Sequence, residues 1–259
     1  MSVPNLEANV LCDMDGVLIK DNALIPGAAE FIAQLSLSGR SFLIVTNNSL
    51  FSPKELQVRL SSMGLHVEEG HFWTSTLAAA RFAADQRPEG SAFVIGENCL
   101  HEAVQAAGYR KDQDSPDFVI LGETWEYSFS DFATATRLVK AGSRFIATNP
   151  EASDRTSQGW LPGCGAMAAL VQAASGVAPF FIGKPNPLML HEALRTLDAT
   201  SQDTVFIGDR MDTDILAGIQ AGLKTILVLS GVATREDADR FPFRPGRIVN
   251  SVADLVSEC

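Results

Sequence analysis

Short apolar runs alternate with amphipathic stretches along almost the whole chain, and this alternation is the feature that most restricts its fold. Each run ends in turn-forming residues, which is typical of strands, and the segments between most of them have helical spacing. A strand–helix–strand order indicates parallel sheets covered by helices. The predicted strands are SFLIVTNN, SAFVIGE, DFVILGE, RFIATNP, PFFIGKP, DTVFIGD and KTILVLSG. We therefore predict a doubly wound α/β protein.

Two of the predicted helices carry start and stop signals near the N-terminal end of the chain. In SPKELQVRLSSMG, Ser52 and Glu55 match a capping box, Pro53 takes the first helical position and Gly64 ends the helix. In PGAAEFIAQLSLSG, Pro26 is placed for a first helical turn. Both helices follow a predicted strand, as the alternation requires.

The predicted strands are too numerous for one compact sheet of the usual width. We therefore expect a second, inserted layer with its own sheet. The stretch ADQRPEGS at 84–91 is a plausible exit to this layer. The long polar stretch at 149–163 is predicted to be a loop of the insert.

Composition limits the partners of the chain. The formal net charge of -11 opposes nucleic acid or an anionic membrane as the main partner, because either would need a basic face. No run of about 18 apolar residues occurs, and the N-terminus lacks a leader pattern, so a cytoplasmic location is expected. Four widely spaced cysteines suggest neither disulfides nor a zinc site. A homo-oligomer is compatible with the sequence.

The stretch NVLCDMDGVLI places two carboxylates at the end of an apolar run. Residues 10–12 are typical of an interior strand, and Gly16 signals a turn. Side chains at i and i+2 of an extended segment point the same way, so Asp13 and Asp15 are expected to face one small volume. Two like charges so close repel each other and raise one pKa, so a compensating positive charge is expected nearby.

Other polar residues follow predicted strands, where ligands lie in open α/β sheets. They are Thr46 with the main chain of Asn47 and Asn48, then Lys184, Asp209 and Asp214. Each alone has an ordinary explanation: a cap, a solvated strand end, or an acid that favours the helix dipole. Together with the aspartate pair they predict oxygen ligands, a hydroxyl and an ammonium at one sheet edge.

Such a set suits phosphoryl transfer to a carboxylate. Magnesium prefers hard oxygen ligands and is usually held by one or two carboxylates plus a substrate phosphate. One carboxylate can then act as nucleophile and form an aspartyl-phosphate that water breaks down, while the second acts as acid and base. Lys184 and Thr46 would hold the phosphate oxygens as charge spreads in the transition state.

These residues also carry a family resemblance. DMDGV, TNN, Lys184 in GKPNP, and GDRMDTD resemble, in order, the four motifs of the haloacid dehalogenase superfamily of phosphatases. PGA, ATNP, GKP, TDILAG and the ending TILVLSGV are similar to the NagD-type subclass IIA. The resemblance implies a Rossmann-like three-layer α/β/α core with a parallel sheet at 1–75 and 179–259. It also implies an inserted α/β cap of the C2 type at 76–178.

The resemblance assigns roles to the residues that match the first three motifs. Asp13 would be the nucleophile and a metal ligand through its carboxylate. Asp15 would be the acid and base, and would bind the metal through its backbone carbonyl. Thr46, Asn47 and Lys184 would bind the phosphate, and Mg²⁺ is the implied cofactor.

Roles in the last motif and in the cap follow in the same way. Asp209 would ligate the metal, and Asp214 would support its water shell, whereas Asp212 matches nothing. Thr148 and Asn149 would face the substrate, although an ordinary turn explains them equally well. Two further strand-end acids fall inside the implied cap and are set aside, namely Glu97 and Glu123.

The predicted activity is magnesium-dependent hydrolysis of small phosphomonoesters. Nucleoside monophosphates are the first choice of substrate, and sugar phosphates, phosphoglycolate and pyridoxal phosphate are alternatives. A phospho-aspartate receiver-type switch would pair similar residues, but it would leave the cap unexplained. A glycosyltransferase also places D-x-D on a metal, but it has no evident use for Lys184. Dehalogenation proper needs neither a second acid nor magnesium.

Overall fold

The fold is described from a computed structural model, which describes residues 9–156 and 159–259. The N-terminal segment on which the expected location depends falls largely outside these residues. The chain divides into two compact units. The core unit comprises the residues up to Thr46, Pro53–Trp73 and Lys184–Cys259, and the inserted unit comprises Asn47–Ser52 and Thr74–Gly183. The predicted assignment of 1–75 and 179–259 to a phosphatase core and of 76–178 to a cap stays a prediction.

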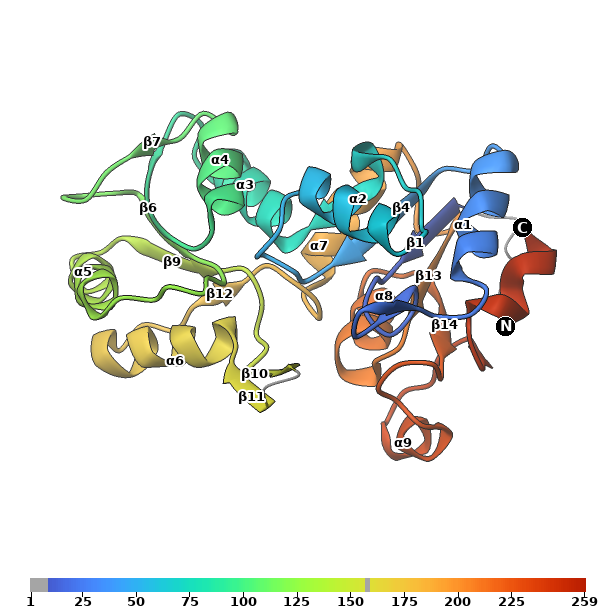
Figure 1. Cartoon of the computed structure of the whole chain (residues 1–259). Coiled ribbons are helices and arrows are strands. Elements are labelled where there is room, and N and C mark those ends of the chain that lie inside the picture. The colour runs from blue at the N-terminus through green and yellow to red at the C-terminus, as the bar shows by residue number, and fades with distance from the viewer. Residues whose placement is uncertain (1–8, 157–158) are drawn as a thin grey trace. The chain divides into compact units, whose positions relative to one another are not determined.

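A six-stranded sheet of order β15-β14-β13-β1-β4-β5 forms the centre of the core unit (Figure 1). Its pairings from β15 to β4 are parallel. The strands are almost continuously apolar and buried, as expected when helices cover both faces of a sheet. They are β1 (Asn9–Cys12), β4 (Phe42–Thr46), β5 (Phe72–Thr74), β13 (Thr204–Gly208), β14 (Lys224–Val228) and β15 (Arg247–Val249).

The register of this sheet brings distant parts of the chain to one edge. Cys12 at the end of β1 pairs with Ile207 of β13 on one side and with Ile44 of β4 on the other. Because the strands run in parallel, the residues that follow them emerge together at the carboxyl edge. Asp13 and Asp209, 196 positions apart in the numbering, are thereby brought to neighbouring strand ends.

Short helices and turns complete the core unit. Helix α2 begins at Pro53, as predicted, but α1 begins at Ala28 after Gly27, so the placement of Pro26 in its first turn is wrong. Gly27 takes φ 89°, a conformation that favours glycine, and this delays the helix. The helices are α1 (Ala28–Leu37), α2 (Pro53–Ser62), α7 (Pro187–Leu197), α8 (Leu216–Gln220) and α9 (Arg235–Arg240). Shorter elements are β2 (Ile19–Lys20), β3 (Ala23–Leu24), η1 (Glu69–His71), η2 (Met211–Ile215) and η3 (Val252–Glu258).

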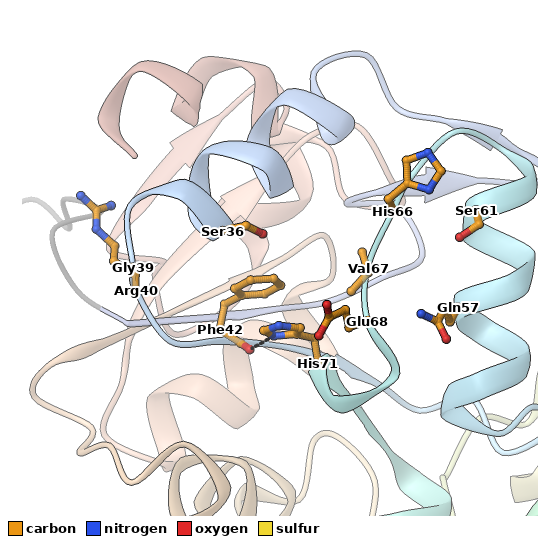
Figure 2. Close-up of a pocket in the computed structure, with 10 residues that line it drawn as sticks. All are labelled: Ser36, Gly39, Arg40, Phe42, Gln57, Ser61, His66, Val67, Glu68 and His71. Carbon is orange, nitrogen blue, oxygen red and sulfur yellow. Dashed lines mark hydrogen bonds between the residues drawn. The ribbon is translucent and has the colours of Figure 1, made fainter.

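A hollow of about 510 Å³ opens in the core unit near the start of β4 (Figure 2). The His71 ring stacks on the Phe42 ring with centroids 4.0 Å apart, and its Nδ1 lies 3.0 Å from the Phe42 carbonyl. Phe42 begins β4, whereas Thr46 ends it. The hollow is therefore at the opposite end of the strand from the predicted phosphate-binding residues.

The inserted unit has its own parallel sheet, of order β12-β9-β8-β6-β7. Figure 1 shows α3 and α4 on one side of it and α5 and α6 on the other. The strands are β6 (Ser91–Ile95), β7 (Arg110–Lys111), β8 (Phe118–Leu121), β9 (Arg144–Ala147) and β12 (Phe180–Phe181). The helices are α3 (Ser75–Gln86), α4 (Asn98–Ala106), α5 (Phe129–Lys140) and α6 (Cys164–Ser175). The predicted fold class, a Rossmann-like core with an inserted α/β cap, is confirmed.

The segment 149–163 was expected to be a loop, and this prediction is wrong. It contains an antiparallel hairpin of β10 (Ser153–Thr156) and β11 (Gly159–Pro162). Its residues are mostly polar or turn-forming, so hydropathy conceals the two strands, which pair with each other through their backbone groups. The four cysteines are free thiols, and three of them are buried. In the described ranges, the helices are all too short or too polar to span a bilayer.

The packing of α5 and α6 predicts unequal effects of two leucine truncations. Leu138 of α5 is fully buried in the cluster that α5 and α6 form with β6, β8 and β9, whereas Leu170 of α6 is 46% exposed. Leu138→Ala should lower the free energy of unfolding by about 2–5 kcal/mol, because it leaves a cavity. Leu170→Ala should change it by less than about 0.5 kcal/mol. Urea unfolding followed by circular dichroism tests this, and equal effects would contradict the packing.

Candidate active site

The two N-terminal aspartates take different environments. Strand β1 ends at Cys12, and the chain then turns, with the Leu18 N–H donating to the Met14 carbonyl at 2.9 Å. Asp13 is buried and its N–H donates to a carbonyl of β13, whereas Asp15 is exposed. Strand β1 ends before both acids, so the i, i+2 argument for an extended segment does not apply to them, and the expectation that both carboxylates face one small volume stays a prediction. The charges that crowd Asp13 come from elsewhere.

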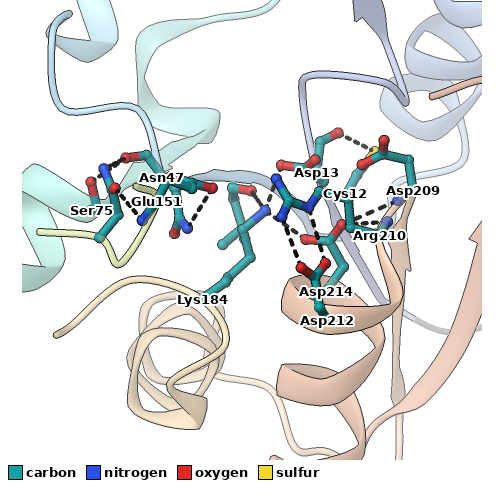
Figure 3. A network of polar contacts seen from close by, with 12 residues as sticks. Cys12, Asp13, Asn47, Ser75, Glu151, Lys184, Asp209, Arg210, Asp212 and Asp214 are labelled. Carbon is teal, nitrogen blue, oxygen red and sulfur yellow. Dashed lines mark hydrogen bonds and ion pairs between the residues drawn. The ribbon is translucent and has the colours of Figure 1, made fainter. Parts of the chain in front are cut away.

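Lys184 contacts two of the buried acids of the core unit, Asp13 and Asp214 (Figure 3). Its ammonium Nζ donates to Asp13 Oδ1 at 2.6 Å and forms an ion pair with Asp214 Oδ1 at 2.8 Å. Nζ also donates to the Val45 carbonyl at 3.2 Å. Lys184 is only 3% exposed, so these contacts replace its hydration shell. The ammonium supplies part of the compensating positive charge that was expected near Asp13.

Asp214 shapes the turn that follows β13. Its Oδ2 accepts the main-chain N–H groups of Asp209 at 3.2 Å and of Arg210 at 3.0 Å. Its other oxygen is the one paired with Lys184. Asp212, which matches no family residue, is held by the Arg210 guanidinium at 2.9 and 3.1 Å. Asp214 therefore joins the turn to the lysine.

Asp209 has one oxygen fixed and one without a hydrogen-bond partner. Oδ2 accepts the Val232 N–H at 2.7 Å, and Oδ1 is buried with no hydrogen bond. A Cβ atom at Gly16 or at Gly231 would collide with the Asp209 carboxylate. The two glycines therefore allow the backbone to approach this carboxylate closely. A buried carboxylate oxygen without a donor is unusual and fits a site that receives a cation.

The carboxylates of Asp13, Asp209 and Asp214 form one group. Each offers an oxygen within 4.8 Å of the oxygens offered by the other two. Among the residues that the structure describes, these three carboxylates are the group that could hold a metal ion. Three carboxylates and one ammonium leave two negative charges in a buried volume. One divalent cation would balance them, and hard carboxylate oxygens are the ligands that Mg²⁺ prefers. The residues present therefore fit the expected ion.

The pKa values reflect the same crowding. Burial raises the pKa of Asp13 well above its usual range; the Lys184 ammonium opposes this rise, and the Asp214 and Asp209 carboxylates add to it. Burial also raises the pKa of Asp209 to about 7, with the Asp214 carboxylate adding to the effect. For Lys184 burial lowers the pKa, but Asp13 and Asp214 outweigh it, so the net shift is upward. One ammonium is thus insufficient to hold all three acids ionised.

The residues after β4 belong structurally to the inserted unit. Thr46 ends β4 and is buried. The Asn47 carbonyl accepts hydrogen bonds from Ser75 Oγ at 2.6 Å and from Asn149 Nδ2 at 3.1 Å. The Asn47 side chain donates to Glu151 Oε1 at 3.2 Å (Figure 3). These hydrogen bonds hold Asn47, the first residue after β4, against other residues of the inserted unit.

Ser49 is held by strand ends of the same unit. Its N–H and Oγ both donate to Glu123 Oε2, at 3.1 and 2.8 Å. Thr148 Oγ1 donates to Ser49 Oγ at 3.1 Å. Thr148 and Asn149 are both fully buried, and their predicted contact with substrate stays a prediction. The structure gives them bonds to the 47–49 segment.

Several of these residues were not predicted from the sequence to have a role in the site. Gly231 and Val232 lie in the ending TILVLSGV, which was noted as a similarity without a function. Ser75 and Glu151 carry no local signal, because a serine at a helix start and an acid in a loop are common. Glu123 was set aside as a strand-end acid. Their roles depend on contacts between segments far apart in the chain.

Comparison with known proteins agrees with this geometry. Residues 10–110 match a family model described as haloacid dehalogenase-like hydrolase, and 181–255 match a second model of HAD-like hydrolases. The ribonucleotide monophosphatase NagD of Escherichia coli K12 is 44% identical over 95% of this chain and 97% of its own. Its solved structure matches with a TM-score of 0.91 over the same shares. The chain belongs to the haloacid dehalogenase-like hydrolase family, among the NagD-like phosphatases.

Other members of this family are also similar. A dihydroxyacetone phosphatase of Corynebacterium glutamicum is 47% identical over 95% of this chain and 89% of its own. The structure of a glycerol phosphate phosphatase of Mycobacterium tuberculosis in complex with magnesium matches with a TM-score of 0.91 at 32% identity. That match covers 96% of this chain and 76% of the mycobacterial one. The predicted family is therefore confirmed.

The raised pKa of Asp209 predicts how stability changes with pH when divalent ions are absent. A carboxyl whose pKa rises from 3.8 to about 7 on folding stabilises the folded state below 3.8. This contribution is lost as pH rises through about 7, because the folded protein must then carry the charge. The Asp209→Asn side chain cannot ionise, so in EDTA the melting temperature of this variant minus that of the wild type should increase from pH 5 to pH 8. A constant difference would contradict this assignment.

Proposed function

We propose that this phosphatase hydrolyses small phosphomonoesters with Mg²⁺ through an aspartyl-phosphate on Asp13. The observation that carries the proposal is the buried Asp13 carboxylate, bound to the Lys184 ammonium at 2.6 Å and grouped with two further acids. A buried carboxylate beside a fixed cation is oriented for attack, whereas a surface aspartate would be solvated and mobile. The proposal also accounts for the retention of three acids in one buried volume.

The steps follow from the chemistry of the side chains. An Asp13 oxygen attacks phosphorus, the P–O bond to the leaving group breaks, and Asp15 gives its proton to the departing oxygen. Water then attacks the same phosphorus, Asp15 accepts the proton, and the bond to Asp13 breaks to release inorganic phosphate. Lys184 and Thr46 bind the phosphate oxygens as charge develops on them. The exposure of Asp15 suits a group that exchanges protons with solvent.

Asp13 and Asp209 are the residues that would hold Mg²⁺ through their carboxylates, with the Asp15 carbonyl as a third ligand. Asp214, which is bound to Lys184, would support the water around the ion. The cation would offset the repulsion between the acids and the incoming phosphate. The magnesium complex of the mycobacterial relative and the unpartnered Asp209 Oδ1 support this assignment.

For the substrate we propose nucleoside monophosphates first, supported by 44% identity to the ribonucleotide monophosphatase NagD. The second candidate is dihydroxyacetone phosphate, supported by the 47% identity to a dihydroxyacetone phosphatase. Other sugar phosphates, phosphoglycolate and pyridoxal phosphate remain alternatives. All are small phosphorylated metabolites, and a cytoplasmic location remains our prediction for the enzyme.

A substrate panel tests the function directly. Purified protein is assayed for phosphate release from AMP, UMP, dihydroxyacetone phosphate, glycerol 3-phosphate, phosphoglycolate and pyridoxal phosphate, with Mg²⁺ and with EDTA. We expect sustained turnover that requires Mg²⁺ and a higher kcat/KM for the nucleotides. Preference for dihydroxyacetone phosphate would favour the second candidate. Release limited to one phosphate per chain would support a receiver-type switch and overturn the proposal.

The nucleophile assignment predicts the effect of one substitution. Asp13→Asn keeps the shape of the side chain but removes its charge, so turnover should fall by at least about 10³-fold. The fold should persist, because the amide can still accept a hydrogen bond from Lys184. Steady-state phosphate release with the preferred substrate measures the loss, and circular dichroism checks the fold. Activity within a few-fold of the wild type would exclude Asp13 as the nucleophile.

A further inference from the structure

The main chain at 47–49 follows Thr46 and is held by side chains from three elements of the inserted unit. Ser75 lies in the first turn of α3, Glu123 follows β8 and Asn149 follows β9. Ser75, Ser49 and Asn149 are all fully buried. In open α/β sheets the carboxyl ends of strands are where ligands bind. In the inserted unit, residues at the carboxyl ends of β8 and β9 bind the 47–49 segment of the same chain.

The carbonyl of Asn47 accepts two donors, Ser75 Oγ at 2.6 Å and Asn149 Nδ2 at 3.1 Å. A peptide unit is planar and trans, so its carbonyl and the following N–H point in opposite directions. Fixing the Asn47 carbonyl therefore also fixes the direction of the Asn48 N–H. The main chain of Asn47 and Asn48 is the part of the segment expected to donate to a phosphate oxygen.

Ser49 closes the other end of the segment by a reciprocal pair of bonds. Its N–H and Oγ donate to Glu123 Oε2, and its Oγ accepts the Glu123 N–H at 3.0 Å. Hydrogen bonds to a carboxylate are stronger than those between neutral groups. A Cβ atom on Gly122, the residue before Glu123, would lie 2.7 Å from Leu100 Cδ2, so the leucine side chain would have to shift. Both ends of the 47–49 segment are thus fixed within one unit.

We propose that Ser75, Asn149 and Glu123 are positioning residues that hold the 47–49 main chain in its phosphate-binding conformation. The inference rests on the proposed function and adds to it three side chains that themselves need not touch the substrate. It gives Asn149 a role different from the substrate contact that the family resemblance implied. It also gives a role to Glu123, a strand-end acid that matches no motif of the family.

Loss of these bonds should weaken phosphate binding more than it slows chemistry. Asn149→Asp keeps the shape of the side chain but replaces the donor with an acceptor that repels the Asn47 carbonyl. We expect KM and the inhibition constants of inorganic phosphate and orthovanadate to rise together by about tenfold, with kcat changing less than threefold. A tenfold change corresponds to about 1.4 kcal/mol, the size of one hydrogen bond. Ser75→Ala should act in the same direction, and Ser75→Thr should restore part of the affinity.

A matched control is available at the end of the neighbouring strand β6. Glu97 Oε1 accepts Thr124 Oγ1 at 2.7 Å and the Trp125 N–H at 3.1 Å, so this acid holds another loop of the same unit. Glu97→Gln and Glu123→Gln remove the same charge from adjacent strand ends. Only Glu123→Gln should raise KM and the phosphate inhibition constant. Thermal unfolding of all variants shows whether a change comes from lost stability instead.

The outcomes separate this inference from the proposed function. If the wild-type protein turns over no phosphate ester, the proposed function fails and the inference falls with it. If the wild type turns over but Asn149→Asp, Ser75→Ala and Glu123→Gln keep wild-type KM and phosphate inhibition, only the inference is overturned. Equal effects of Glu97→Gln and Glu123→Gln would also overturn it. If Asn149→Asp does not fold, Ser75→Ala and Glu123→Gln decide the question.

Discussion

The rest of the site depends on a buried excess of two negative charges. Asp13, Asp209 and Asp214 share one small volume with a single cation, the Lys184 ammonium. Removing carboxylates from water without full compensation is costly, so this cluster is stable only if protons or a bound cation supply the missing charge. The raised pKa values of Asp13 and Asp209 are the response of the ion-free cluster. The same imbalance prepares the site for a divalent cation and an anionic substrate.

The fold maintains this charge arrangement through main-chain contacts. The parallel register of β1 with β13 brings Asp13 and Asp209 to adjacent strand ends. Asp214 ties the following turn to Lys184, while Gly16 and Gly231 leave space for the Asp209 carboxylate. These groups come from four separate stretches of sequence. The strands supply rigidity, so the carboxylates stay close despite their repulsion.

Much of this arrangement was predictable from sequence, because strands end where apolar runs meet turn residues. That rule places Asp13 and Asp209 after buried strands and Thr46 at the end of one, without any knowledge of contacts. Lys184 instead follows β12, an edge strand of the inserted sheet whose two residues are exposed and half-buried. The rule did not predict that the strand stops at Cys12 or that Asp15 is exposed. It also missed the hairpin at 153–162, whose polar residues conceal strand pairing. The bonds that join the 47–49 segment to the insert are long-range and leave no local pattern.

The most direct test of the proposed charge imbalance is the number of divalent cations that the protein binds after its metal ions have been removed. Mn²⁺ titration followed by electron paramagnetic resonance counts the bound ions, and competition with Mg²⁺ shows whether both use one site. We expect one ion per chain, with protons released on binding at pH 6.5, and no such ion when both Asp13 and Asp209 are replaced by Asn. Absence of binding in the wild type, or an unchanged count in the double variant, would contradict it.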